Sequence, residues 1–89
     1  MIAEAAQIAE SLRIQSPKSA ATWVSLGHVA FAQERFQIAA QHFERALELD
    51  PLDRSTMTTL ARAYQRLGDA ARFQRLISRI ASLGGPFGN

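Results

Sequence analysis

Apolar residues recur at spacings of three and four along most of the chain, which is the pattern of amphipathic helices. No segment shows the strict alternation of apolar and polar residues that is typical of a half-buried strand. The pattern therefore predicts an all-α chain of about five antiparallel helices joined by short loops. The expected helices cover about residues 2–15, 18–33, 36–49, 53–67 and 70–83.

The apolar stripe of each helix predicts its buried side. In the first helix Ala5, Ile8, Ala9 and Leu12 form one stripe, and the polar residues lie largely off it. The third helix is expected to bury Ala39, Ala40, Phe43, Ala46 and Leu47 and to turn Arg35, Gln41, Glu44, Arg45 and Glu48 outward.

Two dipeptides that end in proline are expected to separate successive helices. Ser16 precedes Pro17, and further along the chain Asp50 precedes Pro51. A side-chain oxygen can cap the N-terminus of a helix, and proline is tolerated in the first turn. Ser16 and Asp50 are therefore the expected N-caps, and Asp53 adds negative charge near the start of the fourth helix.

Small and aromatic residues indicate close packing around the second helix. Gly27 in its middle should cost about 1 kcal/mol relative to alanine, which is understandable if a neighbouring helix passes too closely for a side chain. Trp23 and Leu26 are expected on the same buried side, where the indole N–H needs a hydrogen-bond partner. After the fourth helix, Gly68 fits a left-handed helix end and Asp69 fits the next N-cap.

A longer pattern runs from Trp23 to Pro51. It resembles one unit of a tetratricopeptide repeat, which reads W-x2-L-G-x2-Y, then A-x3-F, then P, at a period of about 34 residues. Ala30 stands where the pattern has an aromatic residue, and Phe31 follows one place later. The six matching positions are Trp23, Leu26, Gly27, Ala39, Phe43 and Pro51.

A shift by one repeat period aligns the chain with itself. Leu60 then falls on Leu26, Pro51 falls on Pro17, and Tyr64 falls on Ala30 and supplies the aromatic residue that the first unit lacks. The resemblance implies helix-turn-helix repeats stacked as a short right-handed superhelix. The expected parts are a single domain over residues 1–83, with a half repeat at 2–15, a repeat at 20–53 and an atypical terminal repeat at 54–86, and a mobile tail at 84–89.

The net charge of +2 hides an uneven distribution. Residues 1–53 hold four basic and seven acidic side chains, which gives −3, whereas residues 54–89 hold six arginines and Asp69, which gives +5. This distribution favours an acidic partner for the C-terminal repeat, or head-to-tail association between copies of the chain. In the plainer interpretation, the arginines only solvate a terminal helix.

Composition also excludes several classes of protein. The chain has no cysteine, so disulfides and thiolate metal sites are excluded. It shows no signal-peptide pattern and no apolar run of the roughly 20 residues that a membrane span requires. We therefore expect a cytoplasmic protein, and nine arginines against one lysine point to a bacterial genome.

Few residues could carry out catalysis or hold a cofactor. His28 and His42 fall on successive helices and form no metal-binding motif. The hydroxyl residues around Ser55 have no histidine close in sequence, and the chain lacks a glycine-rich phosphate loop. No enzyme activity, cofactor or metal is expected. The arginines suit phosphate groups, but the acidic first half and the shortage of exposed aromatic residues argue against nucleic acid.

The resemblance also implies a binding module, because the first helices of successive tetratricopeptide repeats line a concave face that holds a protein or peptide partner. Val24 and Phe31 would form an apolar end of this face. Arg62 and Arg66 would form a cationic end, suited to the carboxylate of an extended peptide. In the alternative, Val24 and Phe31 only pack on the preceding helix. The implied concave-face residues are Val24, His28, Phe31, Thr58, Arg62, Gln65 and Arg66.

One subfamily of these repeats grips the acidic C-termini of heat-shock chaperones with a lysine and asparagines. Only Arg62 resembles a member of that clamp, which argues against a chaperone tail as the partner.

The first helix has the position of the second half of a repeat, so its apolar stripe is expected to be covered on one side only. Exposed apolar patches usually mark an interface. If further repeats precede it, the chain is an accessory segment of a larger multidomain enzyme, such as a glycosyltransferase. If a second copy covers the stripe, the chain is a self-associating scaffold that forms a homo-oligomer through its N-terminal helix.

Overall fold

The computed structural model describes residues 2–84, and this part of the chain is helical with no strand. The all-α prediction is confirmed, and the helix ends lie close to their expected positions. Residues 85–89, where most of the expected tail falls, lie outside the described residues. The helices are α1 (Ile2–Gln15), α2 (Ala20–Ala32), α3 (Phe36–Leu49), α4 (Arg54–Leu67) and α5 (Ala70–Gly84).

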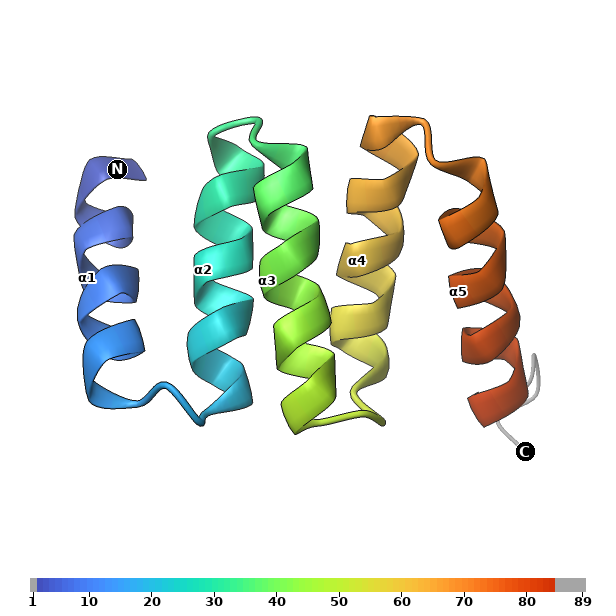
Figure 1. The fold of residues 1–89 in the computed structure, drawn as a ribbon, viewed down its shortest axis with the longest axis horizontal. Helices are drawn as coiled ribbons and strands as arrows, with labels where there is room; N and C mark the ends of the chain where they lie inside the picture. The colour runs from blue at the N-terminus through green and yellow to red at the C-terminus, as the bar shows by residue number, and fades with distance from the viewer. Residues whose placement is uncertain (1, 85–89) are drawn as a thin grey trace.

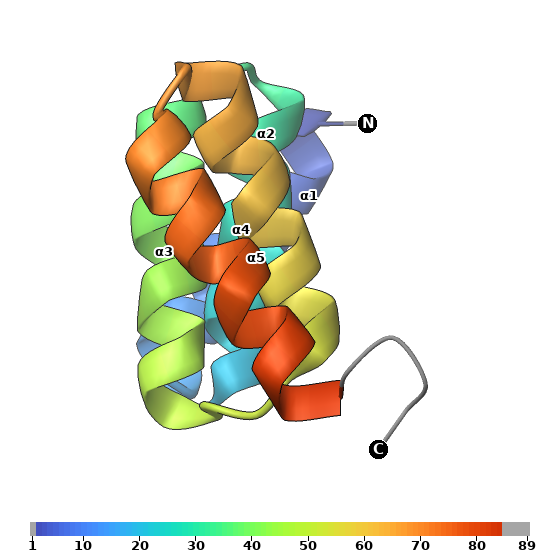
Figure 2. The same cartoon turned by 90° about the vertical axis from the view of Figure 1, so that its right-hand side faces the viewer.

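The helices stand side by side in chain order, each antiparallel to the one before it (Figure 1). The main backbone contacts join α1 to α2, α2 to α3, α3 to α4 and α4 to α5. Viewed from the α5 end, α2 and α4 lie on one side of the array and α3 lies on the other, with α5 inclined in front (Figure 2). The array therefore grows by adding helices along one direction.

The apolar core lies mainly between α3 and α4. All five residues of the predicted inner stripe of α3 are buried, and Phe43 and Met57 are the largest side chains that are fully enclosed. Phe31, Phe73 and Ile80 pack against the edge of this core while remaining partly exposed. The buried cluster consists of Ala30, Ala39, Ala40, Phe43, Leu47, Met57, Leu60, Ala61, Ala63, Tyr64 and Leu76.

The close approach expected at Gly27 is confirmed. A Cβ atom at this position would lie 2.6 Å from Cδ1 and 2.8 Å from Cζ of the Phe43 ring. These separations are far inside van der Waals contact, and Phe43 is fully buried and has little room to move. The glycine therefore lets α3 approach the backbone of α2.

The prediction of the N-caps was wrong, because each observed N-cap lies three residues after the expected one. Ser19 and Asp53 are the N-caps of α2 and α4, whereas Ser16 and Asp50 start the turns that precede these helices. The N–H of Ser19 donates to the carbonyl of Ser16 at 3.2 Å, and the N–H of Asp53 donates to the carbonyl of Asp50 at 3.4 Å. Proline takes the second position of each turn, which its fixed φ favours, so the helix begins only after the turn.

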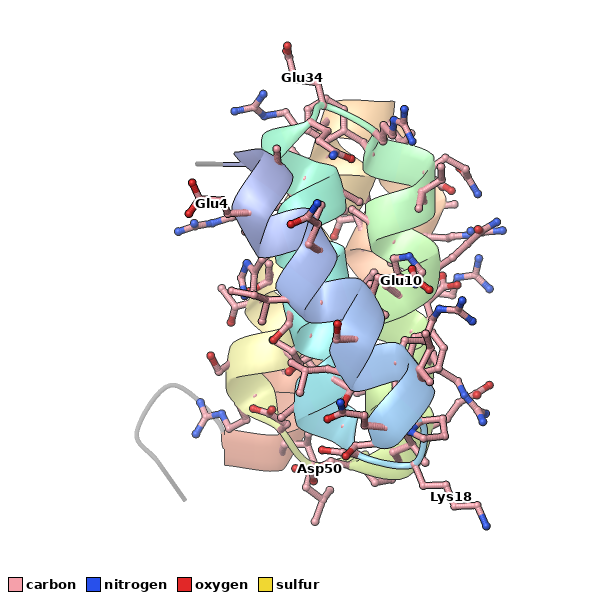
Figure 3. The ribbon with its side chains drawn as sticks, turned by 90° about the vertical axis from the view of Figure 1, so that its left-hand side faces the viewer. Glu4, Glu10, Lys18, Glu34 and Asp50 are labelled. Atoms are coloured by element: carbon pink, nitrogen blue, oxygen red, sulfur yellow. The ribbon has the colours of Figure 1, made fainter. Side chains whose placement is uncertain are left out.

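The loops that follow α2 and α4 share one backbone conformation. Gly68 has the expected left-handed φ of 72°, and Glu34, at the equivalent position of the first repeat, has a φ of 61°. The N–H of Arg35 donates to the carbonyl of Ala30 at 2.9 Å, and Asp69 donates in the same way to Tyr64 at 3.0 Å. Figure 3 shows Glu34 at the top of the view, beyond the ends of the helices. The first repeat thus makes the same turn without a glycine.

The side of α1 that was expected to be buried is only partly covered. Ala9 is buried and Leu12 is half-buried, but Ala5 is exposed and Ile8 is 64% exposed. The helix packs chiefly on α2, so that one neighbour covers a narrower side than the apolar stripe offers. Figure 3 shows α1 lying diagonally in front of α2.

The two residues expected together on the buried side of α2 differ in burial. Leu26 is buried, whereas Trp23 is only half-buried, because it lies at the margin where α2 meets α3. The indole N–H nevertheless has the partner that was predicted for it, since Nε1 donates to the carbonyl of Pro17 at 2.7 Å. Trp23 therefore fixes the loop between α1 and α2 as well as packing against His42.

Candidate functional site

The seven residues expected to bind a partner lie on α2 and α4, and together they are called the α2–α4 face below. On α4 all four are exposed, on the side opposite the buried Leu60 and Tyr64. On α2 His28 is exposed, while Val24 and Phe31 are half-buried. The residues of the α2–α4 face are Val24, His28, Phe31, Thr58, Arg62, Gln65 and Arg66.

The sequence predicted an apolar end and a cationic end for this face. In the structure an apolar residue and a cationic residue lie at the same end. The guanidinium of Arg66 lies 5.7 Å from the ring centre of Phe31 and 5.4 Å from that of Phe36. The two rings meet edge to face, with their centres 5.0 Å apart. Because α2 and α4 run in the same direction, Phe31 and Arg66, each near the end of its helix, reach the same end of the face.

Phe31 also contacts the helix that follows it. Its ring packs on Phe36, at the edge of the core. A cation over an aromatic face contributes about 0.5–1 kcal/mol at an exposed site, so Arg66 is held in place by the two rings. Arg62, one turn earlier on α4, has no ion pair or hydrogen bond from its side chain within residues 2–84.

The histidines have separate surroundings. His28 is exposed, and its ring meets the edge of Phe43 with the ring centres 5.3 Å apart. His42 lies 5.7 Å from the ring of Trp23, and burial, followed by the nearby Arg13, lowers its pKa. In the described part of the chain no three His, Asp or Glu side chains gather closely enough to hold a metal ion.

Two surface grooves lie elsewhere, and none of the seven residues of the α2–α4 face lines either of them. The first, the α1–α3 groove, has a volume of about 260 Å³ and is lined by Ala6, Glu10, Leu26, Val29, Ala30, Gln33, Arg35, Ile38 and His42. The second, the α3–α5 groove, has a volume of about 550 Å³ and is lined by Glu44, Leu47, Glu48, Leu60, Tyr64, Arg72, Arg75, Leu76 and Arg79.

A partly buried polar contact lies at one wall of the α3–α5 groove. The Tyr64 hydroxyl donates to Oε2 of Glu44 at 2.5 Å, and a guanidinium nitrogen of Arg72 lies 3.7 Å from the same oxygen. Burial and then the hydrogen bond to the carboxylate raise the pKa of Tyr64 well above its usual value. Glu44 was expected to face outward, and that expectation was wrong because it turns toward this hydroxyl and is half-buried.

The other charged residues of the α3–α5 groove differ in their partners. Arg79 donates to the carbonyl of Pro51 at 2.9 Å, and Glu48 pairs with Arg45 at 2.8 Å. Arg75 has no ion pair and no side-chain hydrogen bond to any other residue within residues 2–84. The sequence did not reveal this groove, because its two walls come from α3 and α5, which are far apart along the chain.

None of the helices within residues 2–84 has both the length and the apolar character that crossing a bilayer requires.

Residues 20–52 match the tetratricopeptide repeat family model. The matched span begins where α2 begins and ends in the turn after α3, so it covers one complete helix pair. The helix pair of α4 and α5 follows one repeat period later with the same turn conformation. Proteins with such repeats generally mediate protein–protein interactions and are typically non-catalytic. Residues 20–52 of the chain therefore form a tetratricopeptide repeat.

Proposed function

We propose that this chain is a protein–protein interaction module that holds a peptide or protein partner on the α2–α4 face. The observation that supports this best is the exposed row of residues on α4, with Arg62 free of any counter-charge within residues 2–84. An arginine without a local partner retains its full capacity for a bidentate contact with a carboxylate. The role needs no cofactor, metal or catalytic residue.

The chemistry of the face favours an extended partner that combines an apolar side chain with an acidic group. Val24 and Phe31 are half-buried and offer an apolar surface on α2. Thr58 and Gln65 on α4 are exposed and supply polar groups for the backbone of a bound peptide. Arg62 would take the carboxylate, while Arg66 stays over the rings of Phe31 and Phe36.

The test is the binding of a fluorescent, extended peptide that contains leucine, phenylalanine, aspartate and proline. Replacement of both Arg62 and Arg66 by glutamate should weaken binding on the order of tenfold or more, because attraction becomes repulsion. Arg54→Glu is the matched control, since Arg54 is exposed on the same helix and lies outside the face. If the double variant remains folded and binds the peptide as tightly as the unaltered chain, the α2–α4 face is not the binding site.

Self-association through α1 is a second candidate function. Ile8 is 64% exposed and Ile14 is 72% exposed, so α1 presents an apolar surface that a second copy could cover. Light scattering on a sizing column at low and high salt tests this idea. A dimer that is indifferent to salt and is lost in Ile8→Glu would support it, and a monomer at both salt concentrations would reject it.

If this chain is an accessory segment of a larger multidomain enzyme, such as a glycosyltransferase, further repeats would cover α1 instead. The α2–α4 face would then present a partner to a catalytic domain located elsewhere. A parent sequence with a further W-x2-L-G pattern before residue 1 would favour this alternative over self-association.

A further inference from the structure

The two surface grooves are one feature that repeats with the sequence. One repeat period separates Glu10 in the α1–α3 groove from Glu44 in the α3–α5 groove, and Leu26 corresponds to Leu60 in the same way. The α1–α3 groove runs over α2, and the α3–α5 groove runs over α4 in the same way. The groove itself is therefore a consequence of the repeat, and any selectivity must come from the side chains that differ.

The charged lining residues sum to 0 in the α1–α3 groove and to +1 in the α3–α5 groove, where three arginines outnumber two glutamates. Arginine provides one lining residue of the α1–α3 groove, Arg35, but three of the α3–α5 groove, namely Arg72, Arg75 and Arg79. The α3–α5 groove is apolar at its base, because one leucine of each helix, Leu47, Leu60 and Leu76, lines it. A cationic wall beside an apolar base is suited to a ligand that is both apolar and acidic.

The local carboxylates do not neutralise this wall. Glu44 is already engaged by the Tyr64 hydroxyl and by Arg72, and Glu48 is engaged by Arg45 outside the groove. Arg79 donates to a neutral carbonyl, so its charge is uncompensated. Arg75 has no such contact at all within the described residues. Two positive charges therefore remain available on the α5 side of the groove.

The α3–α5 groove is separate from the α2–α4 face. The two surfaces share α4 but use opposite sides of it, since Leu60 and Tyr64 turn toward α3 and α5 while Arg62 and Gln65 are exposed on the other side. In Figure 2, which faces the α5 end, α5 lies in front of α4 and α3 lies to the left of it. The two successive helix pairs can thus carry two binding surfaces, one on each side of α4.

We propose that the α3–α5 groove is a second binding site, which takes an acidic amphipathic helix from a protein partner. Apolar side chains on one face of that helix enter the groove over Leu60 and Leu76, in the helix-in-groove mode of peptide recognition. Carboxylates that flank the apolar face pair with Arg75 and Arg79. The groove volume of about 550 Å³ has room for a few side chains, so the contact is a short one.

The experiment uses a fluorescent synthetic helix with leucines on one face and flanking glutamates, and a second peptide in which lysines replace the glutamates. Fluorescence anisotropy should show that the glutamate peptide binds on the order of tenfold more tightly than the lysine peptide, and that the preference falls with added salt. Arg75→Glu should weaken binding of the glutamate peptide by a similar factor. Because the Arg75 side chain makes no ion pair or hydrogen bond within the described residues, this change should leave the thermal melt unaltered.

Two further variants serve as controls. One distinguishes this site from the α2–α4 face, and the other is expected to strengthen binding and not to weaken it. Arg62→Glu carries the same charge change on the opposite surface and should leave binding of this helix unchanged. Glu48→Gln removes a carboxylate from the groove and should strengthen binding about two- to fivefold, since a single exposed charge pair has a small effect.

Three results would overturn the proposal. The first is unaltered binding in Arg75→Glu. The second is a loss of binding in Arg62→Glu instead, which would place the helix on the α2–α4 face. The third is a dimer that Arg75→Glu dissociates, since a second copy of the chain would then be the occupant of the groove.

Discussion

The ring of Phe43 lies directly against the backbone of Gly27, in the space that a Cβ atom would need. Phe43 is fully buried in the centre of the core, and Gly27 lies in the middle of α2. The contact therefore sets how closely the two helices of the first repeat can pack. The equivalent positions of the second repeat hold Ala61 and Ile77. That repeat therefore has a larger residue in place of the glycine and a smaller one in place of the phenylalanine.

Gly27→Ala should destabilise the protein although alanine is the better helix former. Overpacking of a core costs about 1–3 kcal/mol, and the gain in helix propensity returns about 1 kcal/mol of it. We expect a net loss of up to about 2 kcal/mol in the free energy of unfolding, measured by urea denaturation. The same substitution combined with Phe43→Ile reproduces the residue pair of the second repeat. The double variant should be more stable than the sum of the two single effects predicts, and simple additivity would refute this explanation.

Glu34→Gly should stabilise the protein. Glu34 has a left-handed backbone, which costs a residue with a Cβ atom about 1 kcal/mol, and glycine avoids most of this cost. We expect a gain of about 0.5–1 kcal/mol in the free energy of unfolding. Gly68→Ala is the reciprocal control. No atom lies within 4 Å of a Cβ there, so its expected loss of about 1 kcal/mol would come from the backbone alone.

Asp53→Ala should lower the free energy of unfolding by about 1 kcal/mol, because α4 loses its N-cap. The Asp53 carboxylate accepts from the N–H groups of Ser55 and Thr56 at 3.1 and 3.3 Å and from the Thr56 hydroxyl at 2.7 Å. Ser19→Ala is a matched control at the equivalent position, since the Ser19 side chain makes no capping hydrogen bond. Equal losses in the two variants, measured by thermal melts, would mean that the carboxylate contacts contribute nothing.

Tyr64→Phe should cost about 1–2 kcal/mol, because a hydrogen bond to a charged acceptor is lost from a buried hydroxyl. The raised pKa also has a consequence at alkaline pH. In the unfolded chain the hydroxyl ionises near its ordinary pKa of 10.0, whereas the folded chain keeps the proton. The stabilisation is therefore complete below pH 10 and is lost as the pH rises further.

Ultraviolet absorbance measures this titration without ambiguity, because Tyr64 is the single tyrosine of the chain. Glu44→Gln should lower the pKa of the folded protein toward the ordinary value, since the second cause of the shift is removed. A titration of the folded protein at the ordinary pKa would contradict the observed hydrogen bond.

Features that depend on residues close together in the sequence could be predicted. The inner stripe of α3 follows from the spacing of its apolar residues, and the left-handed Gly68 follows from its place at the end of a helix. The close approach at Gly27 could also be predicted, because a glycine that weakens the middle of a helix indicates that a neighbour needs the space of its side chain. The local pattern around each proline led to the wrong N-caps. A proline fits both the first turn of a helix and the second position of a β-turn, so the pattern does not distinguish the two.

Features that depend on which helices meet were less accessible. The exposure of Ile8 follows from the narrow contact between α1 and α2, and the local pattern around Ile8 does not contain that information. Tyr64 and Glu44 are 20 residues apart, and nothing in their local patterns marks them as partners. The contact of Arg66 with Phe31 could have been found, because two helices separated by one antiparallel helix must run in the same direction.

Packing between successive helices has a consequence for how the array comes apart. Within residues 2–84 the main contacts of α1 are with α2 and those of α5 are with α4. By contrast, α2, α3 and α4 each have substantial contacts with the helix before and the helix after. Partial unfolding from either end then breaks one interface at a time and leaves the rest intact. Amide hydrogens of α1 and α5 should exchange with solvent first, and those of α3 should exchange last. Fraying of α5 would alternately open and close the α3–α5 groove. The α2–α4 face would keep its shape, because neither α2 nor α4 is at an end of the array.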